Sequence, residues 1–365
     1  MRVTLEDVCE KGASNLKQSD VVSMTGEYPI YGAAGYLGNV DFYHQEKPYV
    51  AIVKDGAGIG RTTLHPAKSS VIGTMQYLLP KDNVLPEYLY YVVRHMHLEK
   101  YFTGATIPHI YFRDYKNEKF NLDSLDKQAE IVEILEKAEL VILKRRQQLA
   151  ELDNLIKARF VELFGTLHNN GNGFDVVTIE DVCSLIKDGT HQTPQYTDDK
   201  ETGYKFLSSK DVMSQKIDWT DIKYIPAELH KKLYATIKPQ RNDILMSKNG
   251  VNYGIAAVND TDEVFDIYVS LALLRPKELI APVFFRCAIN NPETKRQFDS
   301  SIKGIGVPNL HLGEIKKTKI FLPPMELQKE FVSFVEQTDK SKVAIQKALD
   351  EAQLLFDSLM QKYFG

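Results

Sequence analysis

Two long stretches of the sequence carry apolar residues in a seven-residue pattern. The first stretch lies within residues 120–165 and the second within 320–365. Alternating steps of four and three residues are typical of a coiled coil, and no glycine or proline interrupts either pattern. The pattern predicts two helices of about 38 residues, each roughly 57 Å long. Its positions are Ile131, Leu135, Ala138, Ile142, Arg145, Leu149, Leu152, Ile156, Arg159 and Leu163, then Phe331, Val335, Thr338, Lys342, Ile345, Leu349, Ala352, Phe356, Leu359 and Tyr363.

The two stretches are copies of each other. They align without a gap at an offset of 200 residues, and both end in Phe-Gly. Because each apolar stripe needs a partner, we expect the two helices to pack antiparallel, related by a pseudo-twofold axis, with Gly365 near the start of the chain. The identical residues in the first copy are Leu122, Gln128, Glu130, Val132, Glu136, Leu149, Glu151, Leu155, Phe164 and Gly165.

Three charged residues, Arg145, Arg159 and Lys342, interrupt the apolar pattern. We first interpret them as side chains whose stems lie along the apolar stripe and whose charges reach solvent. A second interpretation is that they fix the pairing register of the helices.

The repeat extends into the segments before each helix. "VTLEDVC" (3–9) recurs as "VTIEDVC" (177–183), and "KDGAGIG" (54–60) matches "KNGVNYG" (248–254). The chain is therefore a tandem repeat of a globular part followed by a long helix. We expect an α+β fold in which two α/β domains are separated by two long antiparallel coiled-coil helices. The predicted segments are 1–122 (first domain), 123–168 (first helix), 169–322 (second domain) and 323–365 (second helix).

The opening phrase of each domain predicts a short capped helix. Thr4 and Thr178 stand three residues before Asp7 and Asp181, the spacing of a capping box. Leu5, Val8 and Cys9 then share one face, so we expect the cysteines of both phrases to be buried and to have a structural role.

Two recurring loops suggest contact with nucleic acid. Asp55-Gly56 and Asn249-Gly250 are turn signals between strands, and each follows a lysine. Lysine reaches phosphate, while arginine and asparagine pair with the edges of guanine and adenine. The alternative is an ordinary polar hairpin tip. The candidate DNA-contact residues are Tyr31, Lys54, Arg61, His109, Tyr111, Arg113, His191, Thr193, Lys248, Asn249, Asn252, Tyr253, Lys303, Asn309 and His311.

The matching phrases "GATIPHIYF" (104–112) and "GIGVPNLHL" (304–312) are interpreted as loops that enter a strand. Their glycines allow the backbone to approach a partner closely. The alternative is a turn that supports the helix behind it.

Composition excludes several classes of protein. The net charge is −4, and residues 1–122 and 166–322 are each neutral, with 13 and 20 basic residues balanced by 13 and 20 acidic ones. The N-terminus has no signal peptide pattern and no apolar run is long enough to cross a membrane, so we expect a cytoplasmic protein. The three cysteines have no metal-ligand spacing, and no nucleophile elbow or methyltransferase motif occurs. We therefore expect no metal, no bound cofactor and no catalysis.

In this order and spacing, the chain resembles the specificity (S) subunit of type I restriction-modification systems over essentially its whole length. The resemblance rests on the two helical copies and on "YPIYGAAGYLG" (28–38), "KDGAGIGR" (54–61), "GATIPHIYF" (104–112) and "IKDGTHQTPQY" (186–196). It implies that 1–122 and 169–322 are target-recognition domains, each reading one half of a bipartite, asymmetric site on double-stranded DNA.

The resemblance also implies partners for the chain. The helices would set the spacing of the half-sites and dock methyltransferase (M) subunits, of which we expect two. Motor-nuclease (R) subunits would join through the M subunits. S-adenosylmethionine would be bound by the M partners and not by this chain.

Rival hypotheses remain open. A duplicated scaffold or peptide-binding protein with a helical spacer would explain the repeat, but not the polar loops that recur in both copies. An enzyme such as a fused methyltransferase-specificity protein lacks support from any motif. An orphan or silent specificity subunit has the same sequence features as a working one.

Overall fold

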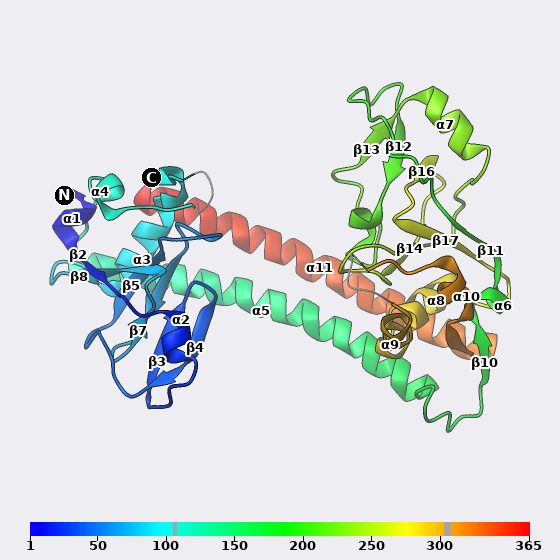
Figure 1. Ribbon diagram of the computed structural model, residues 1–365, viewed down its shortest axis with the longest axis horizontal. Helices are drawn as coiled ribbons and strands as arrows, with labels where there is room; N and C mark the ends of the chain where they lie inside the picture. Colours follow the sequence, from blue (N-terminus) through cyan, green and yellow to red (C-terminus); the bar gives the residue numbers. More distant parts are fainter. Residues whose placement is uncertain (105–107, 303–307) are drawn as a thin grey trace. The chain divides into compact units, whose positions relative to one another are not determined.

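The computed structural model describes residues 1–104, 108–302 and 308–365. These residues form two compact units (Figure 1). Unit 1 consists of Met1–Gln147 and Ile345–Gly365, and unit 2 consists of Gln148–Ala344.

Two helices of 40 residues each, α5 (Leu125–Phe164) and α11 (Met325–Phe364), confirm the prediction from the seven-residue pattern. Each helix contributes one part to unit 1 and the other to unit 2. Each unit is thus a mixed α/β domain together with a segment of both long helices, as expected for an α+β tandem repeat.

Unit 1 contains three antiparallel or mixed sheets. One has the strand order β2-β8-β5-β6, another the order β4-β3-β7, and β1 pairs with β9. The strands are β1 (Arg2–Thr4), β2 (Cys9–Ala13), β3 (Tyr28–Gly32), β4 (Gly35–Val40), β5 (Tyr49–Val53), β6 (Thr62–His65), β7 (Ser70–Val71), β8 (Met75–Pro80) and β9 (Lys119–Asn121). The remaining helices are α1 (Leu5–Val8), α2 (Gln18–Val21), α3 (Pro86–His95), the 3₁₀ helix η1 (Leu98–Tyr101) and α4 (Phe112–Tyr115).

Unit 2 repeats this topology. Its sheets have the orders β11-β17-β14-β15 and β13-β12-β16, and β10 pairs with β18. The strands are β10 (Asp175–Thr178), β11 (Cys183–Asp188), β12 (Tyr204–Leu207), β13 (Lys223–Ile225), β14 (Ile244–Ser247), β15 (Ala256–Val258), β16 (Phe265–Ile267), β17 (Leu271–Pro276) and β18 (Lys319–Leu322). The helices are α6 (Ile179–Val182), η2 (Ser209–Val212), α7 (Ala227–Tyr234), α8 (Pro282–Ile289), α9 (Pro292–Ser301) and α10 (Leu312–Lys317).

The matching sheets pair in the same sense in both units. In the four-stranded sheets every neighbouring pair is antiparallel. In the three-stranded sheets one pair is antiparallel and the other is parallel, β3 with β7 and β12 with β16. The internal repeat read from the sequence is therefore a repeat of strand topology.

The repeated opening phrase forms the predicted capped helices α1 and α6. The backbone N–H of Thr4 donates to Asp7 Oδ2 at 2.8 Å, and that of Thr178 donates to Asp181 Oδ2 at 2.8 Å. These bonds, with those from the threonine hydroxyls, lower the pKa of both carboxyl groups.

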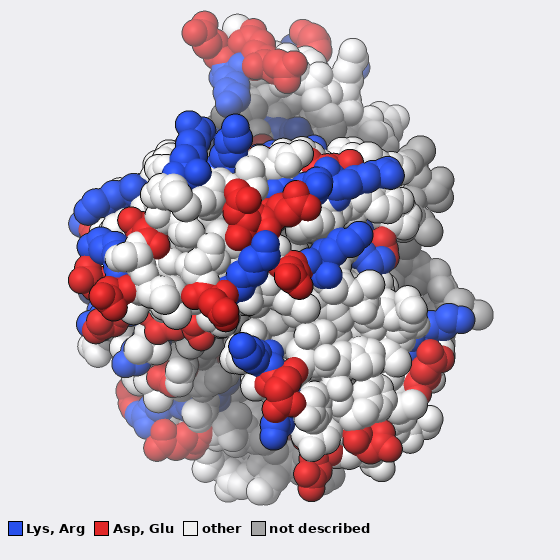
Figure 2. Space-filling model, turned by 90° about the vertical axis from the view of Figure 1, so that its left-hand side faces the viewer, with Lys and Arg blue, Asp and Glu red and all other residues white. Residues whose placement is uncertain are grey.

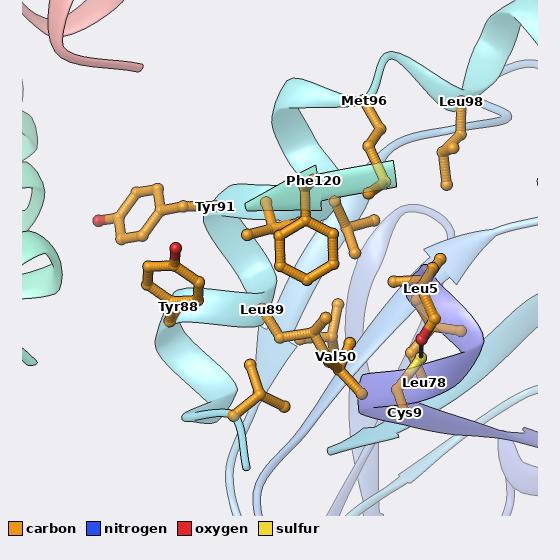
Figure 3. Packing of buried hydrophobic residues seen from close by; sticks show 14 of the residues in the cluster. Leu5, Cys9, Val50, Leu78, Tyr88, Leu89, Tyr91, Met96, Leu98 and Phe120 are labelled. Atoms are coloured by element: carbon orange, nitrogen blue, oxygen red, sulfur yellow. Dashed lines mark hydrogen bonds between the residues drawn. The ribbon is translucent and has the colours of Figure 1, made fainter. Parts of the chain in front are cut away.

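The core of unit 1 lies between α3 and the four-stranded sheet (Figure 3). Leu5 and Leu78 are completely buried there, and Cys9 donates its thiol hydrogen to the Leu5 carbonyl at 3.3 Å. Cys9 and Cys183 are buried and free, as expected, and burial raises the pKa of each thiol to about 12.

The two long helices pack antiparallel within each unit. In unit 1, Leu135 near the start of α5 shares a core with Phe356 near the end of α11. In unit 2, Phe160 near the end of α5 lies 5.5 Å, centroid to centroid, from Phe331 near the start of α11. The expected antiparallel pairing is therefore confirmed in each unit by itself.

Two of the charged residues in the pattern make ion pairs between the helices. Arg159 Nη2 lies 2.9 Å from Glu330 Oε1, and Lys342 Nζ lies 2.5 Å from Asp153 Oδ1. These contacts favour the second interpretation, in which the charges fix the pairing register.

Gln128 attaches α5 to the globular part of unit 1. Its side chain is fully buried, and its Oε1 accepts a 2.8 Å hydrogen bond from the backbone N–H of Leu85, the residue that caps α3. Its Nε2 donates to the carbonyls of Asn83 and Asp123 at 3.0 and 2.9 Å. The amide thus satisfies backbone groups on both sides of the junction.

Gln328 makes the same attachment in unit 2. Its fully buried amide accepts from the backbone N–H of Ala281, the cap of α8, at 2.8 Å. It donates to the carbonyls of Leu279 and Pro323 at 3.1 and 2.8 Å. The recurrence of this glutamine at an offset of 200 therefore has a structural cause.

The repeated Phe-Gly ends explain how each helix terminates. Phe164 is fully buried against Phe284 of α8, with ring centroids 5.0 Å apart. Phe364 packs against Tyr88 of α3 at 5.3 Å, so the C-terminal end of the chain belongs to unit 1. Gly165 adopts a φ of +73°, the left-handed conformation with which glycine commonly ends a helix.

One expectation about the loops before the long helices is wrong. The phrases that end at Phe112 and Leu312 lead into short helices, α4 and α10, and not into strands. Buried Phe112 and Tyr115 show the reason, because a single turn of helix places both on the core side.

Candidate nucleic-acid interface

The turn after β5 meets the loop before α4 at one edge of unit 1. We call residues 54–61 and 108–113 the first tip. The backbone N–H of Ile110 donates to the Lys54 carbonyl at 2.9 Å, and that of Gly56 donates to the Pro108 carbonyl at 3.0 Å. Gly56 has a φ of +91°, which a residue with a side chain adopts only at a cost. The glycine therefore shapes the turn that this pairing needs.

The second tip consists of residues 248–254 and 308–313 of unit 2 and repeats these bonds. Leu310 donates to the Lys248 carbonyl at 2.7 Å, and Gly250 donates to the Pro308 carbonyl at 3.0 Å. Gly250 has a φ of +84°. Both tips join antiparallel strands, β5 to β6 and β14 to β15, which confirms the hairpin prediction.

Charged and titratable side chains meet in the first tip. His109 Nδ1 lies 2.6 Å from Asp55 Oδ1, and Lys54 Nζ lies 2.5 Å from Asp55 Oδ2. Partial burial raises the pKa of Asp55, but its bonds with Lys54 and His109 outweigh this and lower the pKa below its ordinary value of 3.8. The carboxylate is therefore ionised near neutral pH and lies within hydrogen-bond distance of both side chains.

Other side chains of the first tip face solvent. Arg61 is exposed, and Tyr111 and Arg113 expose 46% and 78% of their side chains. The guanidinium carbon of Arg113 lies 4.9 Å from the centre of the Tyr111 ring. This group offers hydrogen-bond donors and a flat aromatic surface to a partner.

In the second tip, a groove of about 530 Å³ brings together five of the candidate residues. The candidates that line it are His191, Lys248, Asn249, Asn309 and His311. Asn309 and His311 are exposed, and the Oδ1 atom of Asn249 is buried without a hydrogen-bond partner among the residues that the structure describes. The groove thus presents amide and imidazole groups, which suit the edges of bases.

Lys248 lies at the bottom of this groove. Only 5% of its side chain is exposed, and its Nζ donates to Asp188 Oδ2 at 2.7 Å. His191 Nε2 approaches the same oxygen at 3.4 Å. Partial burial raises the pKa of Asp188, but the Lys248 bond outweighs it and the pKa is lowered. In this conformation Lys248 supports the groove and does not present its ammonium group to solvent.

The remaining candidates belong neither to the first tip nor to the lining of the groove. Tyr253 is buried, and its hydroxyl donates to Asp299 Oδ1 at 2.5 Å, so it anchors the second tip to α9. Tyr31 in β3 is half-buried against His65, with ring centroids 4.4 Å apart. Asn252 and Thr193 are exposed. Lys303 lies outside the described residues.

Sequence reasoning missed the two carboxylates that organise these groups, Asp55 and Asp188. Both stand inside phrases that the sequence singled out, but their partners lie 54 and 60 residues away along the chain. No local spacing signals such a contact. A residue-by-residue comparison of the two tips shows only that Asp55 of the first corresponds to Asn249 of the second.

Figure 2 shows acidic and basic side chains interspersed on the upper and left parts of one face and a wide area without charge at its lower right, with no continuous basic stripe on that face. Residues 1–122 likewise carry equal numbers of basic and acidic residues. Among residues 1–104, 108–302 and 308–365, no cluster of three or more His, Cys, Asp or Glu side chains is placed to hold a metal ion. In the same ranges, no helix has the length and hydropathy to span a membrane.

Comparison with known proteins gives a consistent picture. The family model described as "Type I restriction modification DNA specificity domain" matches residues 1–154 and 172–353. The chain is 24% identical to the type I restriction enzyme MjaVIII specificity subunit of Methanocaldococcus jannaschii over 326 residues, which is 82% of this chain and 76% of that relative. It is 26% identical to the EcoBI specificity subunit of Escherichia coli over 172 residues, 46% of this chain and 36% of that relative.

Solved structures share the fold. The S subunit of a type I restriction-modification system from M. genitalium superposes with a TM-score of 0.60 at 15% identity, over 100% of this chain and 96% of that one. A structure from a study of complex assembly and conformational transition of the type I system gives a TM-score of 0.54 at 15% identity, over 100% and 97%.

Proposed function

Since the chain belongs to the type I restriction-modification DNA specificity family, we propose that each of its units reads one half of a bipartite, asymmetric DNA site. The observation that carries this proposal is the pair of tips. Their backbone bonds are the same, whereas the side chains they carry differ. Two units built alike but carrying different contact groups suit a site whose two halves differ in sequence.

The first tip would read its half-site with Arg61, Tyr111 and Arg113. Arginine pairs in a bidentate manner with guanine, and the exposed Tyr111 ring supplies apolar contact. The second tip would read with Asn252, Asn309 and His311, since asparagine amides match the donor and acceptor of adenine. Asp55, Lys248 and Tyr253 would hold these groups in place.

The balanced charge of both units suggests that partners supply much of the phosphate affinity. Specific protein–DNA binding depends strongly on Lys and Arg contacts with phosphates. We therefore propose that M subunits, two per S subunit, contribute these contacts, bind S-adenosylmethionine and catalyse methylation in the cytoplasm. R subunits would join through the M subunits, and this chain would catalyse no step itself.

The long helices would dock the M subunits and set the spacing of the half-sites. Both expose large apolar side chains, among them Leu143 (62%) and Leu354 (71%) in unit 1 and Val343 (64%) in unit 2. Exposed apolar residues that gather on one element are typical of protein interfaces.

The test is to map methylated adenines genome-wide in cells that express the full chain with its M partner. We expect a split motif with a fixed gap. Tyr111→Ala should relax the motif in one half only, and His311→Ala in the other half only. The controls are Lys119→Ala and Lys319→Ala, exposed residues at matching positions of β9 and β18. An equal loss in both halves from either tip variant would contradict the assignment of one tip to one half-site.

A further inference from the structure

Unit 2 contains a cavity of about 220 Å³ that lies away from the second tip. It opens to solvent and is lined by residues of α5, α8, α11 and the loops that follow η2 and α8. The charged residues that line it are Arg286, Lys157, Lys216, Lys342, Asp153 and Asp339. Four cations face two carboxylates, so the lining carries an excess of two positive charges.

Arg286 is the buried member of this group. Only 10% of its side chain is exposed, yet its guanidinium makes few contacts within the described part of the chain. Nη1 donates to the Gln215 carbonyl at 3.5 Å and Nη2 lies 3.4 Å from Cys287 Sγ, while Nε has no hydrogen-bond partner in ranges 1–104, 108–302 and 308–365. A guanidinium has five N–H donors, and a buried charge is costly unless it is paired.

The carboxylates of the cavity do not satisfy Arg286. Asp339 lies 4.0 Å from Nη1, beyond hydrogen-bond distance, and is shared with Lys342 at 3.5 Å and Lys216 at 3.6 Å. Asp153 is occupied by Lys342 at 2.5 Å. One carboxylate thus faces three cations, and the cations remain in excess.

The corresponding place in unit 1 is a pocket of about 410 Å³ in which an arginine has a carboxylate partner. Glu139 of α5, the counterpart of Asp339 at the offset of 200, pairs with Arg94 of α3 and accepts a hydrogen bond from Tyr91 at 2.8 Å. Arg94 and Arg286 stand at different positions of α3 and α8, so they are not counterparts. Arg94 pairs directly with Glu139, whereas Asp339 stays 4.0 Å from Arg286 Nη1.

We propose that this cavity of unit 2 binds a small oxyanion of the phosphate or carboxylate type, held by Arg286 with Lys216 and Lys342. Its volume corresponds to roughly seven water molecules at about 30 Å³ each, which admits phosphate or a short dicarboxylate. The oxygens of the bound anion would accept hydrogen bonds from the guanidinium N–H groups of Arg286. The negative charge of the anion would balance the excess positive charge of the cavity lining. Because the ligating residues come from different elements, the anion would tie α8 to α11.

The experiment is calorimetric titration of the full chain with inorganic phosphate, at constant ionic strength against sodium chloride. We expect saturable binding that Arg286→Gln weakens by about tenfold or more, as for loss of charge-assisted hydrogen bonds. Lys216→Gln, at a half-exposed position, should weaken binding by about threefold. The control is Arg296→Gln, an exposed arginine of α9 whose loss should leave the affinity unchanged.

Malonate in place of phosphate tests whether carboxylates share the site, and competition between the two is expected. No saturable phosphate binding by the unaltered chain overturns the proposal. Unchanged affinity in Arg286→Gln also overturns it, because the anion would then bind elsewhere. If Arg286→Gln does not fold, Lys216→Gln decides, and wild-type affinity in that variant counts against the site.

Discussion

In the first tip His109 holds an ionised Asp55 at 2.6 Å, whereas in the second tip two asparagines, Asn249 and Asn309, face each other across the same backbone bridge. The backbone bonds around both pairs match in donor and acceptor. The backbone conformation of each tip therefore depends on main-chain hydrogen bonds and on glycines with positive φ. The side chains at the two paired positions can differ without changing that conformation. Exchange of these side chains can alter what a unit contacts at little cost to its fold.

The ends of the two long helices also share a sequence, Phe-Gly, but differ in how deeply the phenylalanine is buried. Phe164 is fully buried among aromatic rings, with Phe160 and Phe284 both 5.0 Å away, whereas Phe364 is only partly buried. Phe164→Ala should therefore lower the free energy of unfolding of unit 2 by about 4 kcal/mol, and Phe364→Ala that of unit 1 by about 2 kcal/mol. Hydrogen exchange measured by mass spectrometry resolves the two units. Equal losses would show that the helix ends pack alike.

Gln128 and Gln328 provide the opposite case, because both are fully buried and make matching hydrogen bonds in the two units. Gln128→Ala and Gln328→Ala should each cost about 2–3 kcal/mol, since each removal leaves backbone groups unpaired at the junction. Urea unfolding of both variants measures the cost. Gln346→Ala, on the exposed surface of α11, is the control and should change the free energy of unfolding by less than about 0.5 kcal/mol. A cost in one unit alone would mean that the two junctions are not equivalent.

The smallest expected effect is a pH dependence of the free energy of unfolding that comes from the Asp55–His109 pair of the first tip and has no equivalent in the Asn249–Asn309 pair of the second. Because the folded-state pKa of Asp55 lies below 3.8, its stabilisation is complete above the unfolded-state pKa and is lost as the pH falls through the folded-state pKa. Asp55→Asn should therefore cost about 1 kcal/mol from pH 5 to 7 and less below pH 4. Urea unfolding across this range tests it.

The comparison variant for this effect is Asn249→Ala, because an amide does not titrate. Its cost should be the same at every pH at which the chain stays folded. A cost of Asp55→Asn that stays constant down to pH 3 would mean that His109 and Lys54 do not act on an ionised Asp55.

The sequence predicted those parts of the fold that repeat at short range. The seven-residue pattern predicted both long helices and their antiparallel pairing, because each position recurs within one or two turns. The capping boxes at Thr4 and Thr178 were predicted for the same reason. The pairing of strands in sheets such as β11-β17-β14-β15 was not, since it joins residues far apart in the chain.

The candidate residues were predicted less well than the fold. Lys248 was predicted to contact DNA because it precedes a turn signal. Its side chain is instead buried and paired with Asp188 of another strand. Tyr253 was selected as an aromatic residue in a polar loop, and its hydroxyl instead bonds to Asp299 of α9. Both partners are set by tertiary packing, which spacing along the chain does not encode.

Unit 1 consists of two segments far apart in the sequence, Met1–Gln147 and Ile345–Gly365, and this has a consequence for synthesis. Unit 2 is complete once Ala344 has left the ribosome, whereas unit 1 still lacks residues 345–365, which include Phe356 and Phe364. Domains usually fold as they emerge, from the N-terminus onward. We therefore expect the globular part made first to keep an uncovered α5 stripe until residues 345–365 have been synthesised, and truncation before Ile345 to remove part of unit 1 and none of unit 2.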